Sequence, residues 1–410
     1  MAKRILILGA GVAGAQAIKS IHKQFHRQAN YSIMVVDRQN FSAFAPMLHE
    51  AATGSVTPLH VTFPIRQIVK CCLETFRQTS VRQIDVRNKT VHTDDGTVSY
   101  DYLVVALGAK TNHFGVPGAR EHSLDLKTMD DAMILRRRII DTFEEATKLP
   151  RGAQREAKLH FVVIGGGYTG VELAGQLADL FAGDFRALYP EILADEPRIT
   201  LIQAGDRILP ILKESSSQKA LRRLERLGVK VVLNARAASV SPEGVTIENG
   251  EVLRADHVIW TSGVIANGEA FFAPEFLQKG RVMVKSTLQM PDHPEVFVIG
   301  DLAGVTEGNG PHPQTAQAAF EQAHFVAQNL KKLVSGEPLA AFYYHHKGDL
   351  VPIGDRWAIA EIFGLRFSGF LGWWLRRTVY LRGLFSWTDR IQVVFDWTIR
   401  LFTRRDTTRL

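Results

Sequence analysis

Two glycine fingerprints of the form Gly-x-Gly-x-x-Gly carry the clearest chemical signal in this chain of 410 residues. They consist of Gly9, Gly11 and Gly14, and of Gly165, Gly167 and Gly170. Each follows an apolar stretch and opens a stretch with helical periodicity. In that setting the glycines allow a tight turn and a close approach of the backbone to a pyrophosphate at a helix N-terminus. One such motif is a weak signal, but two predict two bound dinucleotides and electron transfer between them.

An acidic residue follows the first fingerprint at the distance expected of a ribose ligand. Asp37 lies 23 residues beyond Gly14, at the end of the next predicted strand. A carboxylate at that place accepts hydrogen bonds from ribose hydroxyls in dinucleotide-binding folds. The alternative interpretation is a solvated acid at a strand end.

The elements that position these residues predict an α/β protein with two Rossmann-like dinucleotide-binding domains. The first βαβ unit consists of strands over 4–8 and 31–36 with a helix over 11–25, and the second of strands over 159–164 and 198–202 with a helix over 169–181. Further strands are predicted over 81–100, 102–107, 229–233, 244–248, 257–260 and 296–299, and further helices over 129–148 and 315–333. The strands are short apolar runs bounded by glycine or turn residues.

Composition excludes several classes of protein. Apolar residues make up 46% of the chain and charged residues 22%, as in folded globular proteins. The two cysteines, Cys71 and Cys72, are adjacent, so a disulfide framework is excluded and a reducing compartment is expected. Gly9 interrupts the apolar run near the N-terminus, so this run predicts a first strand in place of a signal peptide.

The C-terminal segment carries most of the net charge of +7. From Arg366 onward it contains nine arginines, three aspartates and four of the six tryptophans. After Ser386, polar residues recur at helical spacing opposite a mostly apolar face; they are Asp389, Gln392, Asp396, Arg400 and Thr403. Neither this stretch nor the one before it has the ~18 uninterrupted apolar residues of a spanning helix.

We therefore expect helices that lie on an anionic lipid surface, at the cytoplasmic face of the cell membrane, and no nucleic-acid partner. The alternative is a helical pair that packs against the protein body or against a partner in a homodimer.

Beyond the fingerprints, a series of motifs runs through essentially the whole chain. In order they are Asn40-Phe41-x-x-Phe44-x-Pro46-x-Leu48, Leu126-Lys127-Thr128, Gly165 to Ala174, Arg207-Ile208-Leu209-Pro210, Trp260 to Val264, Gly300-Asp301 and Pro313-x-Thr315-Ala316-Gln317-Ala318-Ala319. With this series the chain resembles the type II NADH dehydrogenases, single-subunit flavoproteins that oxidise NADH and reduce a membrane quinone. The resemblance implies non-covalent FAD at the first fingerprint and NADH or NADPH at the second. It divides the chain into an FAD-binding domain (1–120 and 286–340), an NAD(P)H-binding domain (121–285) and a membrane-anchoring region (341–410).

The resemblance also implies the residues of each site and no metal. The FAD site would comprise Gly9, Gly11, Gly14, Asp37, Pro46, Gly108, Asp301, Ala316 and Gln317, and the NAD(P)H site Gly165, Gly167, Tyr168, Gly170, Glu172, Gln203 and Gly263. Asp301 is expected to bond a ribityl hydroxyl of the flavin. Glu172, expected in the first turn of its helix, would handle substrate or supply a proton. The alternatives are a structural acid at a strand end and a carboxylate that serves the helix dipole.

Two residues depart from the family's pattern. The family has a second glutamine one helical turn after Gln317, facing the quinone, where this chain has Glu321. An ionised glutamate beside an apolar quinone would carry a desolvation cost, although a protonated one could donate a proton. The family selects NADH with a glutamate where this chain has Gln203, which removes the repulsion against a 2′-phosphate. NADH stays the expected donor, because Gln203 can still bond a 2′-hydroxyl; Glu172, Gln317 and Glu321 are the expected catalytic residues.

Other functions share this architecture. Pyridine-nucleotide disulfide reductases need a redox cysteine next to the flavin, and the segment 41–46 has none. A ferredoxin-type reductase would be soluble, which disagrees with the tryptophan-rich C-terminus. The expected function is an FAD-dependent transfer of electrons from NADH or NADPH to a membrane quinone. A reductase of another acceptor and a non-catalytic, flavin-bound membrane sensor are the alternatives.

Overall fold

A computed structural model of the protein describes residues 2–69, 74–305, 312–400 and 402–408. Cys71 and Cys72 lie outside the described residues. Contacts divide the chain into two compact units. The first contains Met1–Ala45, Thr62–Lys110 and Val264–His346, and the second contains Pro46–Val61, Thr111–Gly263 and Lys347–Leu410. This division follows packing, whereas the division made from the sequence follows the expected ligands and stays a prediction.

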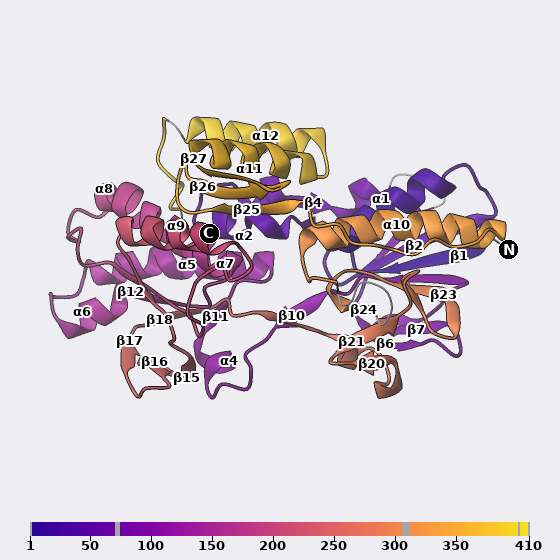
Figure 1. The fold of residues 1–410 in the computed structure, drawn as a ribbon, viewed down its shortest axis with the longest axis horizontal. Coiled ribbons are helices and arrows are strands. Elements are labelled where there is room, and N and C mark those ends of the chain that lie inside the picture. Colours follow the sequence, from indigo (N-terminus) through magenta and orange to yellow (C-terminus); the bar gives the residue numbers. More distant parts are fainter. Residues whose placement is uncertain (1, 70–73, 306–311, 401, 409–410) are drawn as a thin grey trace. The chain divides into compact units, whose positions relative to one another are not determined.

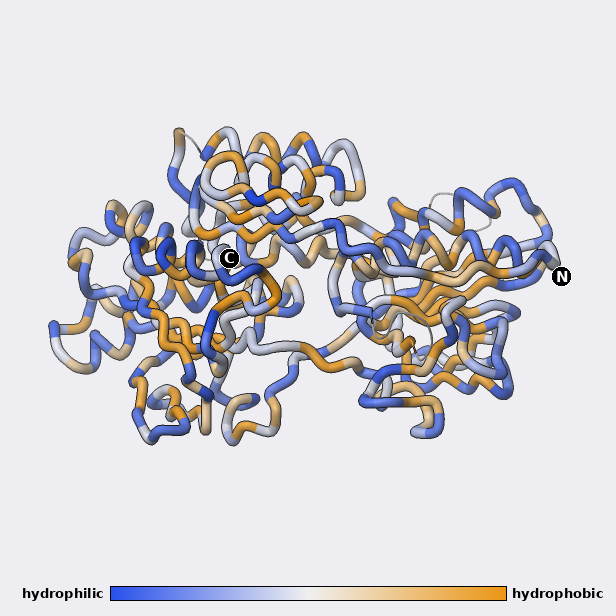
Figure 2. The backbone as a smooth tube through the Cα atoms, viewed as in Figure 1, coloured by the Kyte–Doolittle hydropathy of each residue, from blue (hydrophilic) through white to orange (hydrophobic). Residues whose placement is uncertain are grey.

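A six-stranded sheet forms the core of the first unit (Figure 1). Its strands, in spatial order, are β22 (Gln289–Met290), β23 (His293–Val298), β9 (Tyr102–Val105), β1 (Lys3–Leu8), β2 (Tyr31–Asp37) and β5 (Glu74–Gln78). All neighbours from β23 to β5 are parallel. Ile5, Leu6, Ile7 and Leu8 are completely buried, as expected of a central strand that is covered on both faces. Figure 2 shows these central strands in the colour of hydrophobic residues.

Helices α1 (Val12–Phe25) and α10 (Ala316–Ser335) lie side by side in the first unit (Figure 1). Buried apolar side chains recur on α1 at three- and four-residue intervals; they include Ala17, Ile18, Ile21 and Phe25. Helix α10 begins after the N-cap Thr315, whose hydroxyl accepts a hydrogen bond of 3.3 Å from the backbone N–H of Ala318. Both predicted helices are confirmed.

Small sheets complete the first unit. They are β6 (Val81–Asp85), β7 (Thr90–Thr93) and β8 (Gly96–Ser99); β20 (Leu277–Gln278), β21 (Arg281–Val284) and β24 (Ala303–Val305); and β3 (Phe41–Ala43) with β4 (Thr62–Pro64). The three strands β6, β7 and β8 are antiparallel, which confirms the prediction made for residues 81–100. The short helix α3 (Ile65–Ile68) follows β4.

A five-stranded parallel sheet forms the core of the second unit. Its strands, in spatial order, are β11 (Leu124–Asp125), β18 (His257–Trp260), β12 (His160–Ile164), β13 (Arg198–Ile202) and β14 (Val229–Val232). The main helices are α2 (Leu48–Ala52), α5 (Met129–Ala146), α7 (Tyr168–Leu180) and α9 (Glu214–Arg226), and a small antiparallel sheet holds β15 (Ala237–Ser241), β16 (Gly244–Ile247) and β17 (Val252–Arg254). The short helices are α4 (Ala119–His122), α6 (Ala153–Lys158) and α8 (Arg186–Leu188). The second predicted βαβ unit is therefore confirmed.

The C-terminal part of the second unit adds a three-stranded antiparallel sheet and two helices. The strands are β25 (Gly348–Pro352), β26 (Ala358–Ile362) and β27 (Leu365–Gly369), and the helices are α11 (Phe370–Gly383) and α12 (Trp387–Ile399). Helix α11 packs on this sheet and α12 packs beside α11 (Figure 1). The two helices were predicted and the sheet was not. Among the helices that the structure describes, none combines the length and the apolar character needed to cross a membrane.

Candidate active site

The first glycine turn lies between β1 and α1 and leaves room at one side. A Cβ added to Gly9, which has a φ of +87°, would lie 2.4 Å from the carbonyl oxygen of Ala106. A Cβ on Gly14 would lie 1.9 Å from the carbonyl oxygen of Gly9. A Cβ on Gly11 would meet no atom within 4 Å. The packing of the turn therefore requires the first and third glycines, while the second leaves open space at the N-terminus of α1, where a pyrophosphate fits.

Asp37 is fixed beside this turn. Its Oδ2 accepts a hydrogen bond of 2.6 Å from the N–H of Ala10, and its Oδ1 accepts one of 2.7 Å from the N–H of Gln39. Burial raises the pKa of Asp37, and these backbone donors oppose that rise. The carboxyl group is thus anchored at the end of β2, at the place expected of a ribose ligand.

The parallel strands β1, β2, β9 and β23 have their carboxyl ends at one edge of the six-stranded sheet, and further predicted residues of the FAD site lie at that edge. Gly108 follows β9, and Asp301 follows β23 within a 3₁₀ turn. The side chain of Gln322, on α10, accepts a hydrogen bond of 2.7 Å from the N–H of Gly300. The side-chain amide of Gln314 donates to the carbonyl oxygen of Asp301 at 3.0 Å. These bonds hold the Asp301 turn against the beginning of α10.

The first two turns of α10 present three residues of the expected flavin and quinone sites. Ala316, Gln317 and Glu321 are all partly buried. The Tyr344 hydroxyl donates to Oε1 of Gln317 at 3.2 Å. Gln317 and Glu321 are one helical turn apart, so their side chains emerge on the same side of α10.

The second glycine turn, between β12 and α7, repeats the geometry of the first. A Cβ on Gly165 would lie 2.8 Å from Cα of Ser262, and a Cβ on Gly170 would lie 1.9 Å from the carbonyl oxygen of Gly165. A Cβ on Gly167 would again meet no atom within 4 Å. The second unit therefore offers the same open space at a helix N-terminus, which fits a second dinucleotide.

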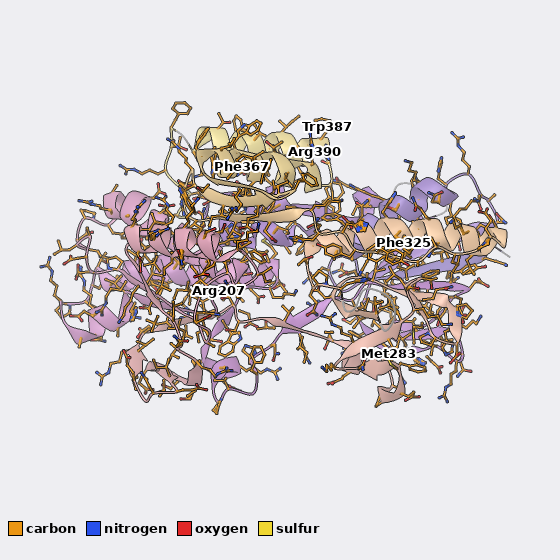
Figure 3. The ribbon with its side chains drawn as sticks, in the orientation of Figure 1. Arg207, Met283, Phe325, Phe367, Trp387 and Arg390 are labelled. Atoms are coloured by element: carbon orange, nitrogen blue, oxygen red, sulfur yellow. The ribbon has the colours of Figure 1, made fainter. Side chains whose placement is uncertain are left out.

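Three further predicted residues lie around the second turn. Oε1 of Gln203 accepts a hydrogen bond of 2.9 Å from the N–H of Gly166, which leaves the amide nitrogen as a donor for a ribose hydroxyl. The Tyr168 hydroxyl donates to Oδ1 of Asp349 at 2.7 Å. Gly263 follows β18, with a φ of +143°. Arg207, labelled in Figure 3, donates to the carbonyl oxygen of Pro210 at 2.7 Å.

Pro46, which was predicted for the FAD site, lies in the 3₁₀ turn Ala45–Met47.

Glu172 does not lie in the first turn of its helix, contrary to the expectation from the sequence. Helix α7 begins at Tyr168, after the N-cap Gly167, so Glu172 is its fifth residue. Its side chain is buried, and its Oε2 lies 3.3 Å from Nδ1 of His49 on α2. The helix dipole acts chiefly on the first turn, so it does not account for this carboxyl group.

His49 and Glu172 belong to a buried cluster of charged side chains within the second unit. Arg376, on α11, forms an ion pair with Oε1 of Glu50. Another nitrogen of the same guanidinium lies 3.4 Å from Nε2 of His49. Trp397, on α12, donates from Nε1 to the other oxygen of Glu50 at 3.1 Å. All five residues are at most 7% exposed.

The pKa values of this cluster follow from burial and from one cation. Burial raises the pKa of Glu172 to about 8, with Arg376 opposing the rise. Burial and the charge of Arg376 lower the pKa of His49 to about 3. Burial alone would raise the pKa of Glu50, but the Arg376 guanidinium overcomes it and holds that pKa at about 2. At neutral pH the cluster thus holds an ionised Arg376–Glu50 pair, a neutral His49 and a mostly protonated Glu172.

Comparison with known proteins identifies the family. Residues 3–323 match the pyridine nucleotide-disulphide oxidoreductase family, and residues 346–406 match the NDH2 C-terminal domain. The chain is 33% identical over 430 residues to the type II NADH:quinone oxidoreductase NdhA of Mycobacterium tuberculosis, covering 98% of this chain and 87% of that relative. The chain belongs to the type II NADH:quinone oxidoreductases. It is also 28% identical over 395 residues to the type II NADH:quinone oxidoreductase of Staphylococcus aureus, covering 94% of this chain and 96% of that relative.

Solved structures agree on the fold of this type II NADH:quinone oxidoreductase. NDH2 from Plasmodium falciparum in complex with NADH matches with a TM-score of 0.92 and 20% identity, covering the whole of both chains. The sulfide:quinone oxidoreductase of Aquifex aeolicus matches with a TM-score of 0.71 and 17% identity, covering 98% of this chain and 96% of that chain. The fold and the family predicted from the sequence are thereby confirmed. This type II NADH:quinone oxidoreductase transfers electrons from NADH, through FAD, to a quinone.

Several residues that the structure brings to these sites in the type II NADH:quinone oxidoreductase were not predicted from the sequence. His49, Glu50 and Arg376 surround Glu172, and Gln322 holds the turn that carries Asp301. A signal existed for two of them: His49 and Glu50 are titratable residues within the apolar stretch 44–52. Consecutive polar residues in such a stretch indicate buried partners.

Proposed function

We propose that FAD binds at the first glycine turn, that the nicotinamide dinucleotide binds at the second, and that Glu172 supplies a proton to the reduced quinone. The observation that carries the role of Glu172 is its setting on α7: a buried carboxyl group whose pKa burial raises to about 8. Quinone reduction consumes two protons. An acid that is protonated at neutral pH and ionises just above it suits their delivery.

The polar contacts to the quinone are proposed for Gln317 and Glu321. Because Oε1 of Gln317 already accepts from the Tyr344 hydroxyl, the amide nitrogen of Gln317 is the group that would donate to a quinone oxygen. Glu321 replaces the glutamine that the resemblance leads us to expect, and in its protonated form it would donate in the same way.

The Glu172→Gln variant is expected to lower quinone turnover by about 100-fold, because a positioned acid contributes on this order to proton transfer. The carboxyl group is protonated below about pH 8 and ionised above it, so wild-type turnover should fall above that pH. The variant lacks this titrating carboxyl group and should lose this alkaline decline. Steady-state assays with a short-chain quinone across pH 6–10 measure both effects, and the absorbance of bound FAD serves as the control. Unchanged turnover with an unchanged pH profile would contradict the role.

Helix α12 turns its polar face toward the protein and leaves its apolar face exposed. Its predicted polar stripe faces the protein: Asp389 is buried, and Asp396 accepts from the N–H of Thr57 at 3.0 Å and lies 2.7 Å from Nδ1 of His60. Large apolar side chains of α11 and α12 are exposed instead, namely Phe370, Leu371, Trp374, Val379, Trp387, Ile391, Val394, Phe395 and Ile399. Figure 3 labels Trp387 and Arg390 near the start of α12. An exposed apolar patch of this kind is typical of an interaction surface.

This face is proposed to rest on an anionic membrane surface. Tryptophans suit the headgroup level of a bilayer, and arginines such as Arg382 and Arg390 on the same helices suit its anionic lipids. The cytoplasmic face of the cell membrane is the proposed location, because two adjacent cysteines in 410 residues fit a reducing compartment. The same face would also serve a homodimer, which is the competing explanation.

Introducing charge into this face is expected to release the protein from lipid. The double variant Ile391→Glu and Phe395→Glu should lower affinity for anionic vesicles at least about tenfold, since each lost apolar contact is worth about 1.5–3 kcal/mol. Vesicle sedimentation at physiological salt measures this. Val252→Glu, at a half-exposed position on β17, is the matched control and should bind like wild type. If the double variant still binds vesicles but its sedimentation mass falls from dimer to monomer, the face is a dimer interface.

A further inference from the structure

The guanidinium of Arg376 determines which nitrogen of His49 carries the hydrogen. One arm of the guanidinium pairs with Glu50, and the other lies 3.4 Å from Nε2 of His49. All guanidinium nitrogens are donors, so Nε2 must accept. In a neutral imidazole the hydrogen then resides on Nδ1. That nitrogen lies 3.3 Å from Oε2 of Glu172.

We infer that Arg376 and His49 are positioning residues for Glu172: Arg376 holds His49 in its Nδ1–H form, and His49 directs that hydrogen at Oε2 of Glu172. With Nδ1–H 3.3 Å from Oε2, the acidic proton of Glu172 resides on the other carboxyl oxygen, Oε1. The carboxyl group is thereby kept from exchanging its proton with the imidazole. Glu172 releases this proton from Oε1 to the quinone oxygen and is left as a carboxylate that Nδ1–H stabilises. This inference rests on the proposed role of Glu172.

The environment keeps His49 neutral, which this arrangement requires. The imidazole is 3% exposed, and an arginine at Nε2 opposes a second positive charge. Burial and Arg376 accordingly hold the pKa of His49 at about 3, far below the working range. A charged imidazole would donate from both nitrogens, and Nε2 could then no longer accept from Arg376.

Helices α11 and α12 hold Arg376 in this orientation. Glu50 pairs with the guanidinium and accepts from Trp397 at 3.1 Å. The ring of Tyr380, one turn along α11, lies 4.3 Å from the guanidinium carbon. The titratable and charged groups that act on Glu172 are therefore His49 and Glu50 on α2, Arg376 and Tyr380 on α11, and Tyr168 on α7 itself. All of them belong to the second unit.

Two measurements on the FAD-loaded enzyme without substrates test the inference. Nitrogen-15 NMR of labelled histidines reports the tautomer, and loss of the signal in His49→Asn assigns it. We expect Nδ1 protonated and Nε2 bare between pH 6 and 9. Infrared difference spectroscopy of the protonated carboxyl band, assigned by its loss in Glu172→Gln, gives the pKa of Glu172 without any turnover.

Two variants of His49 separate positioning from simple packing. In His49→Leu the side chain keeps its bulk and loses the donor, so the pKa of Glu172 should rise by about one to two units, the value of one hydrogen bond to an ionised group. In His49→Asn the amide nitrogen takes the place of Nδ1, so that pKa should stay within about half a unit of wild type. His257→Asn changes an equally buried histidine, which bonds Thr142 and stacks on Phe161, and is the control for general loosening.

The outcomes are distinct. An Nε2–H tautomer, or an equal pKa of Glu172 in wild type and His49→Leu, overturns the inference. An equal shift in His49→Leu, His49→Asn and His257→Asn also overturns it, because that pattern reports packing alone. If the tautomer and the selective pKa shift appear while Glu172→Gln turns over quinone normally, the positioning holds and the proposed role of Glu172 in catalysis fails.

Discussion

Substituting alanine for Gly11 is expected to leave the first unit folded and to abolish its retention of FAD. A Cβ at Gly11 meets no atom within 4 Å, and the residue has a φ of −65° and a ψ of −163°, an extended backbone conformation open to alanine. The added methyl group would instead occupy the open space at the N-terminus of α1. The second glycine of a fingerprint lets the backbone approach the pyrophosphate, so the loss should fall on the ligand and not on the fold.

Two related variants make this result specific. Gly14→Ala places its Cβ 1.9 Å from the Gly9 carbonyl oxygen, so this variant should fail to fold. Gly167→Ala is the counterpart of Gly11→Ala in the second unit and should keep FAD while losing reduction by NADH. The ratio of FAD to protein and the far-ultraviolet circular dichroism of each variant measure these outcomes. A stoichiometric yield of FAD in Gly11→Ala, or its loss in Gly167→Ala, would contradict the assignment of the two sites.

The sheets were predictable because parallel strands covered on both faces are continuous apolar runs. Arg198–Ile202 and His257–Trp260 occur as strands with the predicted bounds, and the fingerprints fix the helix that follows each first strand. The antiparallel sheet β25–β27 was missed because its strands are five residues each and mix polar with apolar side chains without a clear period. Signals of that length do not separate a strand from a loop.

The residues around Glu172 escaped prediction for a different reason. Helix α2 has five residues, too few to display a helical period, and its partners α5 and α7 lie far along the chain. Arg376 was grouped with the surface arginines of the C-terminal segment, because a pattern of charge does not reveal which member is buried. Burial of this arginine depends on Glu50, more than 300 residues away.

Amphipathicity of the last helix was predictable, but the direction of its polar face was not. A polar stripe ordinarily faces water. Here the polar stripe is satisfied by the second unit itself, since Asp396 contacts Thr57 and His60, and Arg400 lies 3.5 Å from Asp355. These partners come from distant segments, so the periodicity alone could not indicate that the apolar face is the exposed one.

Removing the charge of Arg376 alone is expected to cost the second unit about 3–5 kcal/mol of unfolding free energy, because it leaves Glu50 buried and unpaired. Both side chains of the pair are at most 4% exposed, so water cannot replace the missing partner. The variant Arg376→Met keeps most of the side-chain volume. Adding Glu50→Gln removes the orphaned charge while its amide oxygen still accepts from Trp397, so the double variant should recover at least half of the loss.

All six tryptophans lie in the second unit, so tryptophan fluorescence during urea unfolding reports on that unit alone. The matched control is Arg236→Met on the same unit. It breaks an exposed ion pair in which Nε of Arg236 lies 3.2 Å from Oε1 of Glu248, and it should lower the unfolding free energy by less than about 1 kcal/mol. A cost for Arg376→Met as small as that of the control would contradict a buried charge pair. A double variant no more stable than Arg376→Met would show that the loss arises from packing around α11. Recovery in the double variant would establish that the loss in Arg376→Met arises from the buried, unpaired charge of Glu50 and not from lost packing of the C-terminal helices against α2.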